Sequence, residues 1–218
     1  MSQSFGHQEG MKQPSFRRRL TDRVNAGLRA VPSWPLYILL LLPVPWLLYL
    51  AQTGGLGREP IKALEHALGE IALQLLIAGL CVTPLRQHLG VNLLKFRRAL
   101  GLLAFIYVTL HLLVWLVLDI GILSQIWADI LKRPYITIGM AGFVLMLPLA
   151  ITSNNLSIRR MGPSWRKLHR LVYLVVLLGA VHFIMVKKVW ELEPLIYLAA
   201  ILALLVLRLP KKRKPQAA

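Results

Sequence analysis

The chain has 218 residues, of which 56% are hydrophobic and only 16% are charged, whereas globular proteins average about 25% charged residues. The charges are unbalanced: 26 Lys and Arg stand against 9 Asp and Glu, a formal net charge of +17. A chain of this size cannot bury so much apolar surface in one core, so the composition excludes a soluble enzyme and, over most of the length, intrinsic disorder. The single cysteine, Cys81, excludes an intramolecular disulfide, an iron–sulfur cluster and a zinc site built from several thiolates.

Six apolar stretches follow one another along the chain, each close to the roughly 20 residues that a helix needs to cross a bilayer. The ten-residue alternating pattern of a membrane β-barrel is absent. We therefore expect an all-α integral membrane protein, a six-transmembrane-helix bundle over 34–209, between a basic N-terminal tail, 1–33, and a basic C-terminal tail, 210–218. The predicted spans are 34–51, 61–82, 99–118, 135–151, 168–186 and 194–209.

The first two spans have unusual residues. Pro43 and Pro45 predict a kink in the first span, because proline removes a backbone N–H and clashes with the preceding turn. The 33 residues before it do not have the pattern of a signal peptide, so we expect an uncleaved anchor. The second span opens with a series of polar side chains: Lys62, Glu65, His66, Glu70 and Gln74.

The distribution of charge predicts the orientation. One side of the membrane, with both termini and the loops after spans two and four, carries 20 Lys and Arg with two acids, and the other carries six with seven acids. The positive-inside rule therefore predicts that both termini are cytoplasmic. The basic tail 211–214 has no interleaved aromatic residues, so we expect contact with the lipid bilayer and not with nucleic acid.

Two histidines lie inside predicted spans, where polar side chains are costly and suggest function. His111 is 13 residues beyond Arg98 in span three, and His182 is 13 beyond His169 in span five, so both lie roughly 20 Å from the inner surface. Two neutral imidazoles at one depth are what a six-coordinate b-type haem requires. Helix packing or proton relay is the other interpretation of each histidine.

The remaining polar and small residues are less specific. His7 and His88 are expected to be solvated, and the sequence leaves open what His66 and its acidic neighbours do. Gly101 and Gly179 are the slim residues that we expect beside a haem between His111 and His182.

Two segments resemble the ferric reductase-like transmembrane domain. The segment from Arg97 to His111 (RRALGLLAFIYVTLH) resembles its third helix, and WRKLHRLVY from Trp165 to Tyr173, with His182 following, resembles its fifth. Within this superfamily the short chain, which has no reductase domain, is similar to the MsrQ family, formerly YedZ. The resemblance extends over about 34–209.

The resemblance implies a function. Members of this family pass electrons from a cytosolic flavin reductase, through haem b and flavin mononucleotide (FMN), to a periplasmic molybdopterin-dependent methionine sulfoxide reductase (MsrP). That partner repairs oxidised envelope proteins. The chain would then be an electron-transfer subunit of the bacterial inner membrane and not the catalytic subunit. By motif match, His111, His169 and His182 would be the haem-linked, metal-binding histidines.

The sequence departs from two-haem relatives, which use two histidines on each of these helices. Arg97 or Arg98 stands at the inner position of the third helix, and a guanidinium that stays protonated does not ligate iron. The outer pair, His111 and His182, is complete, whereas His169 lacks a partner. One interpretation is that the inner site holds FMN, with Arg97 and Arg98 binding its phosphate.

No dinucleotide-binding fingerprint or phosphate loop occurs in the chain. Electrons must therefore arrive from a separate protein, and the basic cytoplasmic face would suit an acidic one. Two other functions stay open from the sequence: a haem protein that reduces ferric iron or oxygen itself, and a non-redox membrane bundle such as a transporter.

Overall fold

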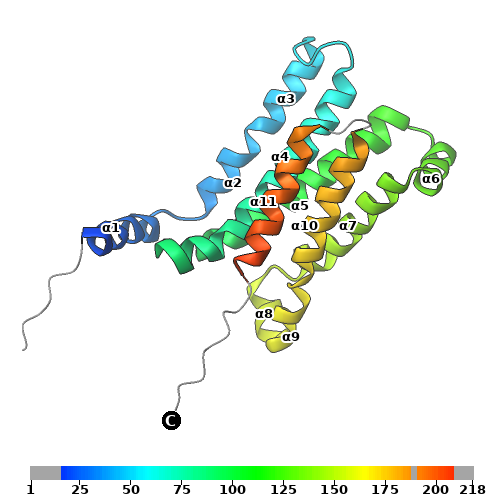
Figure 1. Ribbon diagram of the computed structural model, residues 1–218. Coiled ribbons are helices and arrows are strands. Elements are labelled where there is room, and N and C mark those ends of the chain that lie inside the picture. Colours follow the sequence, from blue (N-terminus) through cyan, green and yellow to red (C-terminus); the bar gives the residue numbers. More distant parts are fainter. Residues whose placement is uncertain (1–15, 188–190, 209–218) are drawn as a thin grey trace, which may run out of the picture.

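A computed structural model describes residues 16–187 and 191–208. All regular elements in these ranges are helices (Figure 1). The basic tail 210–218, the first 15 residues and the loop 188–190 lie outside the described residues. In chain order the helices are α1 (Phe16–Ala30), α2 (Trp34–Leu41), α3 (Pro43–Gln52), α4 (Pro60–Pro84), η1 (Leu85–Leu89), η2 (Leu94–Phe96), α5 (Arg97–Leu113), η3 (Val114–Ile120), α6 (Leu123–Lys132), α7 (Pro134–Ile151), α8 (Asn155–Met161), α9 (Pro163–Leu168), α10 (Leu171–Val186) and α11 (Leu192–Val206).

Among the described residues, five helical segments are long and apolar enough to cross a membrane, which confirms the all-α membrane bundle. The sixth predicted span is α11, which is apolar but has only 15 residues. A helix of that length rises about 22 Å, less than the roughly 30 Å of hydrocarbon core. The five segments are Trp34–Gln52, Pro60–Leu89, Leu94–Ile120, Pro134–Ile151 and Pro163–Val186.

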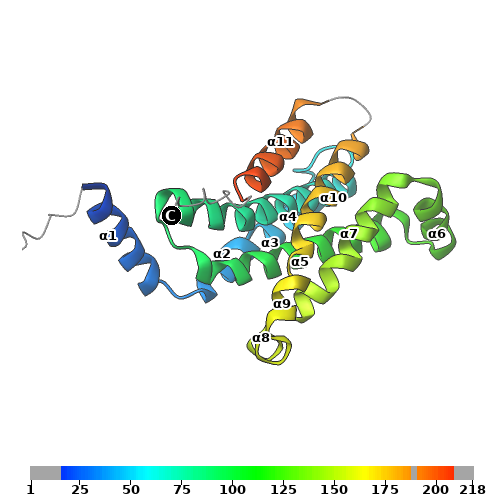
Figure 2. The same cartoon turned by 60° about the horizontal axis from the view of Figure 1, so that its bottom comes forward.

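Two antiparallel helix pairs form the centre of the bundle. α4 packs most extensively against α5, and α10 against α7, while α11 covers α10 and α4 (Figures 1 and 2). Leu103, Ala104, Val176 and Ala180 are fully buried where these helices meet. Small residues at such contacts let helix backbones approach closely, which is how helices associate in lipid.

The first span is broken at the predicted prolines. α2 ends at Leu41 and α3 begins at Pro43, so the helix is interrupted at the position where a kink is predicted, although Leu42 keeps helical dihedral angles. Close to this break the buried Tyr107 of α5 donates a hydrogen bond from its hydroxyl to the carbonyl of Leu40, at 2.6 Å. This bond joins a span whose own side chains are little buried to the core of the bundle.

Four shorter helices were not expected from the sequence: α1, α6, α8 and α9. α1 is tied to the loop between α4 and α5. Asn25 donates to the carbonyl of Gly90 at 2.9 Å and accepts from the backbone N–H of Asn92 at 2.8 Å, and Lys95 donates to the carbonyl of Arg29 at 3.2 Å. The N-terminal segment therefore packs on the same end of the bundle as this loop.

The helix α6 is amphipathic and connects η3 to α7. Leu123, Trp127 and Leu131 are spaced by four residues, which places them on one face, and all three are exposed. Ten residues are too few for a membrane span, so apolar length alone does not predict this helix.

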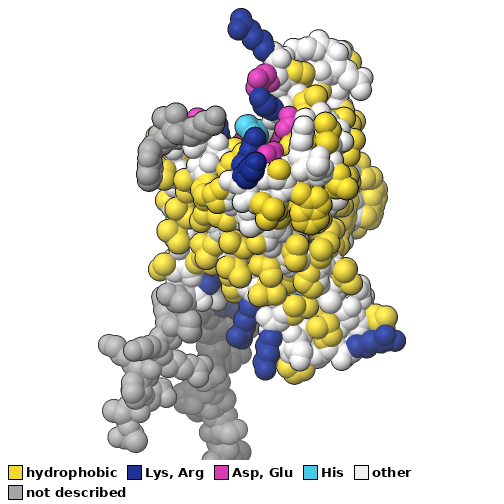
Figure 3. Space-filling model, turned by 90° about the vertical axis from the view of Figure 1, so that its right-hand side faces the viewer, with side chains coloured by type: hydrophobic (Ala, Val, Ile, Leu, Met, Phe, Trp, Pro, Cys, Tyr) yellow, Lys and Arg dark blue, Asp and Glu magenta, His cyan; other side chains and the backbone are white. Residues whose placement is uncertain are grey.

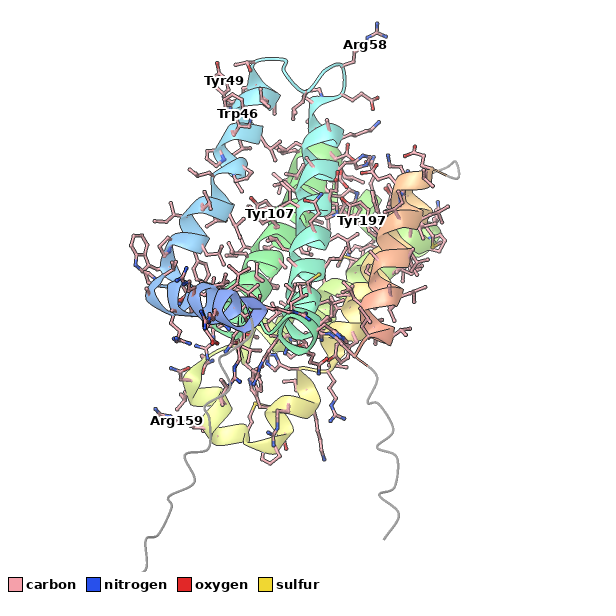
Figure 4. The ribbon with its side chains drawn as sticks, turned by 60° about the vertical axis from the view of Figure 1, so that its left-hand side comes forward. Trp46, Tyr49, Arg58, Tyr107, Arg159 and Tyr197 are labelled. Carbon is pink, nitrogen blue, oxygen red and sulfur yellow. The ribbon has the colours of Figure 1, made fainter. Side chains whose placement is uncertain are left out.

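The surface is divided as a membrane protein requires. Figure 3 shows a broad hydrophobic band with Lys and Arg at its lower end and side chains of both charges at its upper end. Arg58 marks the upper end and Arg159 the lower end in Figure 4. This division agrees with the charge count from the sequence, and the assignment of the basic end to the cytoplasm stays a prediction.

We expect the substitution Tyr107→Phe to lower the free energy of unfolding by about 1 kcal/mol, because it leaves the Leu40 carbonyl without this donor. Unfolding in detergent, followed by circular dichroism, measures the change. Tyr49→Phe is the matched control, since that side chain is exposed and no partner of its hydroxyl is found among the described residues. Equal stability of the two variants would contradict the prediction.

Candidate functional site

A cavity of about 330 Å³ lies between the two central helix pairs. Its deep part is apolar and its mouth, toward the outer end, is charged. His111 enters it from α5 and His182 from α10. The apolar lining comes from all four helices: Ala72, Leu73, Leu76, Val108, Leu112, Ile136, Phe143, Met146, Val175 and Phe183.

The two imidazoles face each other across this cavity. Their ring centroids are 6.2 Å apart and their planes are nearly perpendicular, at 82°. The Nδ1 atom of His111 is 2.8 Å from the carbonyl oxygen of Glu65, and Nδ1 of His182 is 2.7 Å from that of Tyr135. A carbonyl only accepts hydrogen bonds, so each Nδ1 carries a proton. In the neutral form of each ring the lone pair is then on Nε2, which leaves this atom able to bind a metal.

The spacing of the rings fits one metal ion between them. With each Nε2 at about 2.0 Å from a metal, and about 1.1 Å from its own ring centroid, the centroids would be about 6.2 Å apart. No group of three or more His, Cys, Asp or Glu side chains that could hold a metal occurs among the described residues. If both imidazoles bind a metal ion, its remaining ligands would come from a bound group, and the macrocycle of a haem would supply four.

Two glycines lie directly against the histidine rings. A Cβ atom built on Gly69 of α4 would lie 3.1 Å from Nδ1 of His111, and one on Gly139 of α7 would lie 2.9 Å from Nδ1 of His182. The glycines expected from the sequence are elsewhere: Gly179 lines the same cavity, and Gly101 lines a second one. A contact between different helices leaves no periodic signal in the sequence, so these two glycines were missed.

The mouth of the cavity carries both signs of charge. Lys62, Arg133 and Lys187 line it together with the acidic and histidine side chains of Glu65, His66, Glu70 and Asp119. Arg133 pairs with Asp129 at 3.2 Å, and Lys187 pairs with Glu191 at 2.8 Å. The bond to Glu191 raises the pKa of Lys187, which stays charged. Figure 3 shows this mixed charge, with a histidine, at the upper end of the molecule.

A polar network of three side chains joins α4 to α11. Gln74 donates to Glu70 at 2.9 Å and lies 2.7 Å from the hydroxyl of Tyr197, which donates to Glu70 at 3.0 Å. Tyr197 lies between these helices in Figure 4. The polar opening of the second span is thus explained in part by interhelical hydrogen bonding, which is the usual use of such groups in lipid.

A second cavity, of about 640 Å³, lies toward the basic end of the bundle. It contains the other three candidate residues, Arg97, Arg98 and His169, together with Lys95, Arg166 and Arg170. The structure therefore separates the five candidates into two sites, and it does not bring His169 to His111 and His182.

The environment of His169 is aromatic and hydrogen-bonded. Its ring is stacked on Trp165 with the centroids 3.9 Å apart, and its Nε2 atom is 3.0 Å from the hydroxyl oxygen of Thr152. Trp165 donates to the carbonyl of the same Thr152 at 2.9 Å. Arg98 donates to the side chain of Asn155 at 2.8 Å, while Arg97 is exposed. Thr152 and Trp165 were not predicted as site residues.

The two cavities share part of their lining. Leu76 of α4, Met146 of α7 and Val175 of α10 line both and are buried. The wall between the two sites is therefore apolar.

These features define a class of protein: a helical membrane bundle with two histidines close together in a cavity between its central helices. The family described as "Ferric reductase like transmembrane component" matches residues 62–180, more than half of the chain. No solved structure matches the chain significantly.

The curated relatives narrow this class. The chain is 54% identical over 177 residues, 81% of its length and 82% of the relative's, to a protein of Agrobacterium fabrum named "Protein-methionine-sulfoxide reductase heme-binding subunit MsrQ". Proteins of the same name from Brucella ovis and Brucella suis are 50% identical over 187 residues, covering 84% of this chain and 85% of each relative. The chain belongs to the MsrQ family within the ferric reductase-like membrane proteins.

Proposed function

We propose that the chain binds haem b between His111 and His182 and carries electrons across the membrane. The observation that carries this proposal is the 6.2 Å separation of two imidazoles whose Nδ1 atoms are both bonded to carbonyls. The name of the curated relatives, which states a heme-binding subunit, supports it. Haem supplies one-electron redox chemistry when it is bound.

The residues of the cavity suit a carrier of electrons. His111 and His182 would hold the haem iron through two imidazoles, an arrangement that suits the transfer of electrons without binding of a substrate to iron. Their hydrogen bonds to the carbonyls of Glu65 and Tyr135 hold both rings in place, so that little reorganisation accompanies a change of charge. The apolar lining excludes water from the ring faces.

The second cavity is proposed as the FMN site, with Arg97 and Arg98 at the phosphate. Its support is the size of the cavity and the cluster of basic side chains around it. Guanidinium groups bind phosphate in bidentate geometry, and Trp165 with His169 offers an aromatic surface to a flavin. A cytosolic flavin reductase would deliver its electrons here.

We assign the proposed partners from the orientation of the molecule and the charges at its two ends. The proposed orientation has both termini in the cytoplasm and the mouth of the histidine cavity toward the periplasm of a bacterial inner membrane. Electrons then leave through that mouth to MsrP, the molybdopterin-dependent subunit that reduces methionine sulfoxide in envelope proteins. The mixed charges at the mouth offer ion pairs to such a partner.

Removal of either haem ligand tests the first part of the proposal. We expect His111→Ala and His182→Ala each to abolish the low-spin bis-imidazole absorption spectrum, because iron loses an axial ligand. His169→Ala, in the second cavity, is the matched histidine control and retains the spectrum. A pyridine haemochrome assay gives haem per chain, and an unchanged spectrum in the first two variants would exclude this ligand pair.

Loss of the arginines tests the flavin site. We expect Arg97→Ala and Arg98→Ala each to weaken FMN binding by about one to two orders of magnitude, the value of a charge-assisted hydrogen bond. Flavin fluorescence during titration measures the affinity. Arg159→Ala is the control, since this exposed arginine of α8 points away from the bundle (Figure 4). Equal affinity in all three variants would remove the arginines from the site.

Reconstitution in liposomes tests the direction and the acceptor. We expect a flavin reductase and NADH on the cytoplasmic side to drive reduction of methionine sulfoxide by external MsrP, and we expect His111→Ala to stop it. If external ferric iron or oxygen is reduced without MsrP as fast as methionine sulfoxide is reduced with it, the alternative function of a ferric or oxygen reductase is favoured.

A further inference from the structure

Four residues outside the ligand pair hold the two histidines in the same way. We propose that the backbone carbonyl of Glu65 with Gly69, and that of Tyr135 with Gly139, form two equivalent clasps that position His111 and His182. In each clasp the carbonyl accepts the Nδ1–H bond and the glycine one turn later lies against the imidazole. This inference rests on the proposed haem site, which it extends from the ligands to the residues that aim them.

The geometry of the two clasps is closely matched. The carbonyl residue precedes its histidine by 46 positions in one clasp and by 47 in the other. In both, the clasp lies on the first helix of an antiparallel pair and the histidine on the second: α4 with α5, and α7 with α10. The haem site is thus assembled from two similar helical hairpins, although the sequences EHALG and YITIG share only the final glycine.

Glycine is required in both clasps because the ring occupies the space of a side chain. A Cβ on Gly69 would meet two atoms of the His111 ring at 3.1 and 3.3 Å, and one on Gly139 would meet the His182 ring at 2.9 and 3.0 Å. Real Cβ contacts are rarely this short, so an alanine at either position would require the ring to shift, which would strain its bond to the carbonyl. The second clasp is the tighter of the two.

The same helices provide glycines without this contact. Gly79 of α4 has no atom within 4 Å of a built Cβ, and Gly142 of α7 meets only Leu178, at an ordinary 3.8 Å. Alanine favours the helix more than glycine does, so helix propensity alone predicts no loss at any of the four positions. The contact with the ring is what distinguishes the clasp glycines.

The experiment compares Gly69→Ala and Gly139→Ala with Gly79→Ala and Gly142→Ala. Haem per chain, the proportion of low-spin haem by electron paramagnetic resonance and the midpoint potential are measured on purified full-length protein. Thermal unfolding of the same samples, followed by circular dichroism, reports on the fold. We expect Gly139→Ala to lose at least half of its low-spin haem and Gly69→Ala to show a smaller change of the same kind. Gly79→Ala, outside the histidine cavity, should match the wild type. Gly142→Ala, which adds a methyl group to that cavity without touching either ring, should keep more low-spin haem than Gly139→Ala.

Three outcomes are decisive. Wild-type spectra in both clasp variants would overturn the proposal of the clasps and leave the proposed haem site unaffected. A wild-type protein without bis-imidazole haem overturns the proposed function, and the clasps with it. Equal losses in the clasp and control variants, together with equal loss of thermal stability, show a general packing effect and also overturn the clasps. Should Gly139→Ala fail to fold, Gly69→Ala with its milder contact decides alone.

Discussion

The bundle depends on keeping two imidazoles neutral, each with its Nδ1–H paired to a carbonyl, among mostly apolar side chains. A ring N–H without an acceptor costs free energy in a membrane, and a charged ring costs more. The carbonyls of Glu65 and Tyr135 provide the acceptors. A carbonyl oxygen has two lone pairs, so each can accept the histidine N–H and still accept a hydrogen bond within its own helix. The packing of α4 on α5 and of α7 on α10 is therefore tied to the orientation of His111 and His182.

The two cavities differ in the chemistry of their linings. The first combines apolar walls with two uncharged ligands and suits a planar group that is held through its metal. The second combines arginines with an aromatic pair, Trp165 and His169, and suits an anion with a flat ring. The cations of the first cavity lie at its mouth and not among its apolar side chains, and a missing arginine in the second would leave a phosphate without a partner.

The sequence predicted the elements that are long or that lie at a calculable depth. The membrane bundle, the break at Pro43 and the approach of His111 to His182 all follow from apolar length, proline chemistry and helical rise. Contacts between helices could not be predicted this way, so Gly69 and Gly139 were missed and Gly101 was assigned to the wrong cavity. α6 was not predicted because its ten residues are too short and too polar to be recognised as a membrane span.

The wall shared by the cavities has an electrical consequence. Leu76, Met146 and Val175 have no proton to donate or accept, whereas electrons can tunnel across a few apolar side chains. On the proposed route an electron would cross this wall without a proton beside it, and each passage would move one negative charge through part of the membrane voltage. A full crossing is worth about 2.3 kcal/mol per 100 mV. In the proposed orientation the cytoplasm is the negative side, so the voltage of an energised cell would drive electrons outward toward the repair reaction.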